Sequence, residues 1–113
     1  MSAVMLHESS YRPIPMADYE ISVHEGVVAV NAWLDHHFPG DRRGYLPREG
    51  NRPHLWKVPR GPHGPGFSLA VWEDLLQRSG MLADRLATVE RGTSVQRDGE
   101  WIVLSTRGIE RRG

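Results

Sequence analysis

Cysteine is absent from this chain of 113 residues. Its absence excludes disulfide bridges, thiolate zinc sites and a cysteine nucleophile. Long apolar runs are missing as well, because no segment approaches the ~20 apolar residues that span a bilayer. Residues 1–16 also lack the cationic start and apolar stretch of a signal peptide. We therefore expect a soluble, cytoplasmic protein with no membrane partner.

Net charge is missing too. Fourteen Lys and Arg residues balance fourteen Asp and Glu residues. A neutral molecule has no strong field to draw it onto nucleic acid or an anionic membrane. Lysine is nearly absent, since thirteen of the fourteen cations are arginines. This composition suits bidentate recognition of phosphate or carboxylate, although a coding bias toward arginine is the preferred explanation.

Proline, glycine and positive charge are concentrated in residues 39–66. This segment holds six of the eight prolines, six of the twelve glycines, and six cations against two acids, which gives it a net charge of +4. A connection of this length with little regular structure is uncommon inside a compact domain, and it is usually either functional or disordered. We predict a long basic Pro/Gly-rich loop over residues 39–66.

The chain has a length typical of one domain, so we predict a single domain over residues 1–113. Residues 1–16 show no apolar period and are predicted to form a flexible N-terminal arm. Between residues 23 and 38, apolar side chains recur at steps of four, three, four and four, which predicts a helix. Ser22 and Glu25 have the spacing of a capping box at its start, and Pro39 follows its end.

A second helix is predicted over residues 69–79. Ser68 is placed as its N-cap, Gly80 as its stop, and Phe67 and Trp72 as a hydrophobic staple. The following residues, 81–91, fit either a helix or a strand.

Strands are predicted near residues 93–97 and 100–105, because Asp98-Gly99 between them is typical of a tight hairpin turn. Residues 54–58 alternate enough for one short strand, which the prolines on either side would confine to a sheet edge. The charged tail, residues 107–113, is predicted to fray.

These elements predict an α+β fold, with two amphipathic helices packed on a small antiparallel sheet and a C-terminal β-hairpin. Their order also allows a winged-helix-like arrangement, in which residues 69–91 form a helix-turn-helix around Gly80. The match is loose, because Leu76 stands where such motifs usually have a small residue. Asp84 and Glu90 would also repel phosphate from the presumed reading helix.

Two aromatic side chains are interspersed among the six cations of the basic segment, a combination that suits binding to an anionic partner. The candidate partner-binding residues are Arg42, Arg43, Tyr45, Arg48, Arg52, Trp56, Lys57 and Arg60. Trp56 has a second interpretation, in which it anchors the segment to the core. The segment does not resemble a phosphate-binding loop, because no Gly-Lys-Ser or Gly-Lys-Thr follows Gly61–Gly66.

Neither a metal site nor a cofactor is expected, and no catalytic residue is assigned. His24-Glu25 would need a histidine at position 28 to form a zinc-protease helix, and Val28 stands there. Ser68 would need a preceding strand to act as the nucleophile of a hydrolase elbow, and the proline-rich sequence before it predicts none.

The function we expect is that of a small non-enzymatic binding protein, accessory or inhibitor-like, that docks on an anionic protein surface through the basic loop. A nucleic-acid-binding winged-helix-like protein is the first alternative. The second alternative is a small His/Arg-dependent phosphodiesterase or toxin-like enzyme. That enzyme requires His36, His37, His54 and His63 to converge in one cleft.

Overall fold

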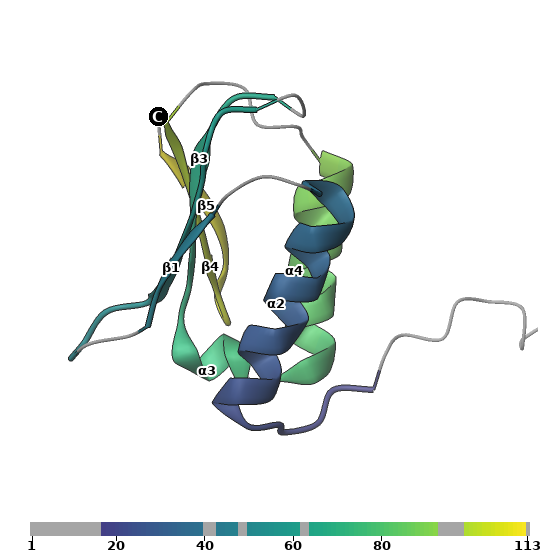
Figure 1. Cartoon of the computed structure of the whole chain (residues 1–113). Coiled ribbons are helices and arrows are strands. Elements are labelled where there is room, and N and C mark those ends of the chain that lie inside the picture. The colour runs from purple at the N-terminus through teal and green to yellow at the C-terminus, as the bar shows by residue number, and fades with distance from the viewer. Residues whose placement is uncertain (1–16, 40–42, 48–49, 62–63, 93–98, 113) are drawn as a thin grey trace, which may run out of the picture.

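A mixed five-stranded sheet carries helices on one of its two faces (Figure 1). The computed structural model describes residues 17–39, 43–47, 50–61, 64–92 and 99–112. Its elements are α2 (Val23–His37), β1 (Gly44–Leu46), β2 (His54–Val58), β3 (Phe67–Val71), α3 (Glu73–Leu76), α4 (Ser79–Gly92), β4 (Glu100–Ser105) and β5 (Gly108–Arg112). The α+β prediction is confirmed.

The strands lie in the order β1-β2-β3-β4-β5, so each neighbours the next along the chain. All neighbouring pairs are antiparallel except β3 and β4, which are parallel. A parallel pair needs a crossover connection, and α3 and α4 lie in that connection. Helices α2 and α4 lie side by side over one face of the sheet, with α3 at one end (Figure 1).

The predicted helix over residues 23–38 is confirmed as α2, with its capping box. The Glu25 amide donates to Ser22 Oγ at 3.0 Å, and the Ser22 amide donates to Glu25 Oε1 at 2.9 Å. The face of α2 that contains Val30 and Leu34 is buried against the core. Both features predicted from the sequence, the capping box and the apolar face of this helix, are thus confirmed.

The predicted helix over residues 69–79 is wrong. Residues Phe67–Val71 form β3, and Ser68 lies inside this strand instead of capping a helix. Four of the five β3 residues are buried, and a strand buried on both faces carries an apolar run that periodicity cannot distinguish from a helix. A short helix, α3, follows at Glu73–Leu76, and Gly80 lies within α4. The helix-turn-helix around Gly80 is therefore not formed.

Residues 81–91, whose state the sequence left open, belong to α4. Leu82, Leu86 and Val89 of this helix are buried in the core. None of the helices in the described part of the chain is both long and apolar enough to cross a membrane.

The basic segment 39–66 contains two strands, β1 and β2, so the prediction of a long loop is corrected. β2 pairs with β1 on one side and with β3 on the other, so it is an inner strand and not an edge strand. Pro53 and Pro59 lie just outside its bounds, where they remove no donor from the hydrogen-bonded ladder.

A C-terminal pair of strands is present, but β4 pairs with residues other than those predicted. The strand over 100–105 is confirmed as β4, while residues 93–97 lie outside the described residues. β4 pairs with β3 and β5, and β5 is formed by the tail that was predicted to fray. Gly108, with φ of 148°, allows the tight turn between β4 and β5. Arg111 Nε also lies 2.8 Å from Glu100 Oε2, an ion pair that joins the two strands.

At Gly26, α2 approaches the backbone of α3 closely, and replacement of this glycine gives a test of the packing. A Cβ at position 26 would overlap the backbone carbonyl of Leu76. We expect Gly26→Ala to lower the free energy of unfolding by about 2 kcal/mol, because overpacking outweighs the gain in helix propensity. Urea denaturation measures the change. Gly44→Ala, which meets no neighbouring atom, is the matched control and should be nearly neutral.

Candidate functional site

The side of the sheet opposite α2 and α4 is uncovered by the described elements, and we call it the open face (Figure 1). Side chains alternate between the two faces along each strand. Trp56, Leu69 and Ile102 are paired in register and lie in the core under the helices. Their neighbours in sequence therefore point to the open face.

Two register rows cross the open face. The first runs Lys57, Ser68, Trp101 and Arg112, and we call it the basic row. The second runs Leu46, Leu55, Ala70, Val103 and Glu110, and we call it the apolar row. Because the rows are two residues apart along the strands, their side chains lie next to one another.

The open face exposes large apolar side chains. Trp101 is 41% exposed and Leu46 is 54% exposed, while Leu55 and Val103 are partly exposed. Ala70, between Leu55 and Val103, is buried. The surface therefore combines an apolar centre with polar margins, as protein interfaces do.

Arg112, in the basic row, is paired with Glu110 in the apolar row. Arg112 Nη2 lies 3.2 Å from Glu110 Oε1, and this hydrogen bond and the carboxylate charge raise the pKa of Arg112. Both side chains are well exposed. In the order of the basic row, Trp101 lies next to Arg112 on one side, and Ser68 and then Lys57 follow on the other side.

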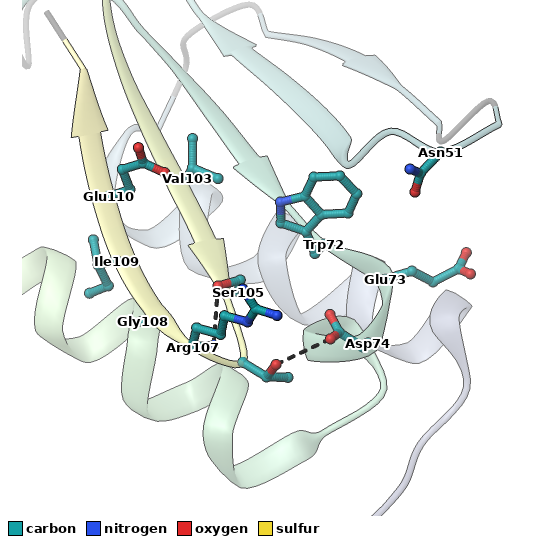
Figure 2. Close-up of a pocket in the computed structure, with 11 residues that line it drawn as sticks. Asn51, Trp72, Glu73, Asp74, Val103, Ser105, Arg107, Gly108, Ile109 and Glu110 are labelled. Atoms are coloured by element: carbon teal, nitrogen blue, oxygen red, sulfur yellow. Dashed lines mark hydrogen bonds between the residues drawn. The ribbon is translucent and has the colours of Figure 1, made fainter.

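A hollow of about 640 Å³ lies at the other end of the open face, beside the indole ring of Trp72 (Figure 2). The Thr106 hydroxyl donates to Asp74 Oδ2 at 3.1 Å, and the Arg107 amide donates to Ser105 Oγ at 3.1 Å. Its charged lining residues are Glu73, Asp74, Arg107 and Glu110. Glu110 is already paired with Arg112, so the remaining charged lining consists of two acids and one cation.

The predicted partner-binding residues do not share one surface in the structure. Lys57 lies in the basic row, and Arg52 and Arg60 are exposed. Arg43 forms an ion pair with Asp35 of α2, and its side chain is only 15% exposed. Arg42 and Arg48 lie outside the described residues.

Trp56 requires a correction, because it offers no face to a partner. Its side chain is 0% exposed, and its indole Nε1 donates to Asn31 Oδ1 of α2 at 3.0 Å. The alternative interpretation of this residue, an anchor to the core, describes its position. Tyr45 packs on it with ring centroids 4.9 Å apart.

Tyr45, His54 and Glu73 form a polar chain on the helix side of the sheet. The Tyr45 hydroxyl lies 2.9 Å from His54 Nδ1, and His54 Nε2 lies 3.4 Å from Glu73 Oε2. Partial burial raises the pKa of Tyr45 above its ordinary value. The hollow beside Trp72 is lined by Glu73 but by neither Tyr45 nor His54. The contacts between Tyr45, His54 and Glu73 thus link β1 to β2 and β2 to the start of α3.

The described histidines do not converge. His36 and His37 lie at the C-terminal end of α2, beside Phe38, whose ring packs on Phe67 at the start of β3. His54 pairs with Val71 at the opposite end of β3, and His63 lies outside the described residues. Within the described ranges, no group of three His, Asp or Glu side chains could hold a metal ion.

Sequence reasoning missed Trp72 and Trp101 as surface residues. The alternation of Trp101, Val103 and Ser105 with buried Ile102 and Leu104 was available as a signal for the second tryptophan. Trp72 carried no such signal, because its neighbours were interpreted as a helix. Comparison with known protein families, curated proteins and solved structures found no match.

The contrast between Trp56 and Trp101 can be tested by replacing each with alanine. Trp56→Ala should lower the free energy of unfolding by about 3–5 kcal/mol, because it empties a core site and leaves Asn31 unpaired. Trp101→Ala should cost about 1 kcal/mol or less, since the side chain is already partly in water. Chemical denaturation followed by circular dichroism measures both values. Equal losses would contradict the assignment of Trp101 to the surface.

Proposed function

We propose that this chain is a small non-enzymatic binding protein, accessory or inhibitor-like, that docks on an acidic protein surface through its open face. The observation that carries the proposal is the exposed Trp101, held between Lys57 and Arg112 on a sheet face that no described element covers. Tryptophan and arginine are the side chains most often found at the energetic centre of protein interfaces.

The apolar row supports a protein partner. Leu46, Leu55 and Val103 give the open face a hydrophobic centre next to Trp101. Contiguous apolar surface on a small protein commonly marks an interaction site. Burial of this row would supply the binding free energy, and Lys57 and Arg112 would select an acidic partner.

Nucleic acid remains the alternative partner, because an indole between two cations suits stacking of a base. Against it, Asp74 and Glu110 lie on the same side of the molecule, where a polyanion would be repelled. The chain as a whole also carries no net charge. Every nucleotide of a nucleic acid carries a phosphate, whereas a protein can place its acidic groups opposite Lys57 alone and other groups opposite these carboxylates, so the arrangement favours a protein.

The proposal moves the docking surface from the basic segment to the open face, to which that segment contributes Leu46, Leu55 and Lys57. Lys57 is kept as a contact residue, and Arg52 and Arg60 are exposed cations near it in sequence. Arg42 and Arg48 stay predictions. The enzymatic alternative gains no support from the described histidines, because His54 lies apart from His36 and His37.

Affinity capture from the native cell, with and without nuclease, identifies the partner, and titration of the purified pair then tests the surface. We expect Trp101→Ala to weaken binding roughly 30-fold, the loss typical of an interface hot spot. Lys57→Ser should weaken it less and should reduce its dependence on salt. Asp84→Ser, on the outer side of α4, is the matched control.

Unchanged affinity of both open-face variants, or a loss with Asp84→Ser alone, would reject the open face as the docking surface. A partner released by nuclease would show that the nucleic-acid alternative is correct. Circular dichroism of every variant ensures that the comparison is made between folded proteins.

A further inference from the structure

We infer that the hollow beside Trp72 binds a neutral sugar ring. This site goes beyond the proposed function, because the described residues that line the hollow include none of the basic row. The volume of the hollow, about 640 Å³, lies within the range of small-molecule sites. Three features support a sugar: an aromatic wall, a polar lining held in place by the fold, and unpaired donors and acceptors around the aromatic ring.

The indole of Trp72 forms the aromatic wall (Figure 2). Trp72 directly follows β3, and its amide donates to the Leu104 carbonyl at 3.1 Å, which continues the pairing of β3 with β4. Its carbonyl accepts from the Leu75 and Leu76 amides at 3.0 and 3.1 Å. Because both backbone groups of Trp72 are bonded, its place beside the hollow is set before a ligand arrives.

The turn between β4 and β5 forms a second, polar wall. Arg85 of α4 donates from Nε to the Ser105 carbonyl at 3.1 Å and from Nη2 to the Thr106 carbonyl at 3.0 Å. The Thr106 hydroxyl donates to Asp74 Oδ2 at 3.1 Å, which joins this turn to α3. A binding site supported by such contacts from neighbouring elements is organised without its ligand.

Donors and acceptors around the indole are left unpaired. Within the described ranges, neither the Arg107 guanidinium, nor the Asn51 side-chain amide, nor the Trp72 indole N–H has a hydrogen-bond partner. Asp74 bonds to Thr106 through Oδ2 alone, so its Oδ1 is an unused acceptor. Each hydroxyl of a sugar both donates and accepts, and one ring can therefore pair with both kinds of group.

The charges of the lining argue against a simple ion as the ligand. Glu110 is paired with Arg112, so Glu73 and Asp74 stand against Arg107. The two carboxylates would repel an anion, and the guanidinium would repel a cation placed beside them. A neutral ring with many hydroxyl groups avoids both costs.

Stacking on the indole supplies the apolar part of the contact. The C–H groups on one face of a pyranose carry partial positive charge, and the face of an aromatic ring carries partial negative charge. Val103 also lines the hollow and adds apolar surface. A ring stacked on Trp72 would direct its hydroxyls outward from the indole, toward Asp74 and Arg107 (Figure 2).

Proton–nitrogen correlation NMR of the full chain provides the test, because each of the four tryptophans gives its own indole N–H signal. The probes are methyl α-glucopyranoside, methyl α-galactopyranoside and methyl α-mannopyranoside, titrated separately. At least one should shift the Trp72 signal saturably, with a dissociation constant of roughly 1 mM, since a single ring makes few contacts. The signals of Trp56, which is buried, and of Trp101, which lies outside the hollow, should stay in place.

Variants of the lining are compared by saturation transfer to the signals of the bound sugar. Asp74→Asn should weaken binding about tenfold, because it replaces a charged acceptor. Trp72→Ala should abolish binding, and Trp72→Phe, which keeps an aromatic face, should restore part of it. Asp84→Asn is the matched control and should bind as the wild type does, because Asp84 is 64% exposed on α4 and does not line the hollow.

The absence of a saturable Trp72 shift with every sugar, at concentrations about a hundredfold above the expected constant, overturns the inference. A saturable shift with glycine and with no sugar also overturns it, because the hollow would then take a zwitterion. Failure of the proposed function is a separate result, measured by titration of the captured partner. A Trp72→Ala chain that loses the sugar and keeps the partner would show that the two sites are distinct.

Discussion

The parallel pairing of β3 with β4 is the constraint on which the rest of this structure depends. Parallel neighbours cannot be joined by a tight turn, so the chain must leave the sheet, cross one of its faces and return. Helices α3 and α4 make this crossing, and α2 packs beside α4 on the same face. The helix layer is therefore on one side, and the opposite side of the sheet is left uncovered by the described elements.

This asymmetry gives each strand two different tasks. On the covered face, Trp56, Leu69 and Ile102 are fully buried and hold the helices to the sheet. On the open face, Lys57 and Trp101 alternate with them and meet the solvent. One set of residues keeps the fold and the other is free to contact another molecule, so the two sets can be changed separately.

The basic segment shows how local composition can mislead. Its prolines and glycines are typical of a loop, yet between them His54–Val58 becomes an inner strand. The prolines end this strand instead of interrupting it, and Trp56 carries its hydrogen bond to Asn31 into the core. Among the cations of the segment that the structure describes, Lys57 lies on the open face and Arg43 is paired with Asp35 of α2.

By itself, the sequence determined α2 with its capping box, the strand over residues 100–105 and the α+β class, because each depends on spacing between near neighbours. It also identified Lys57 as a surface cation. Only the tertiary structure decided that Phe67–Val71 is a strand and that Trp72 and Trp101 share an open face with Lys57. An apolar run fits a helix or a buried strand equally well, so the choice rests on partners far away along the chain, which local spacing does not specify.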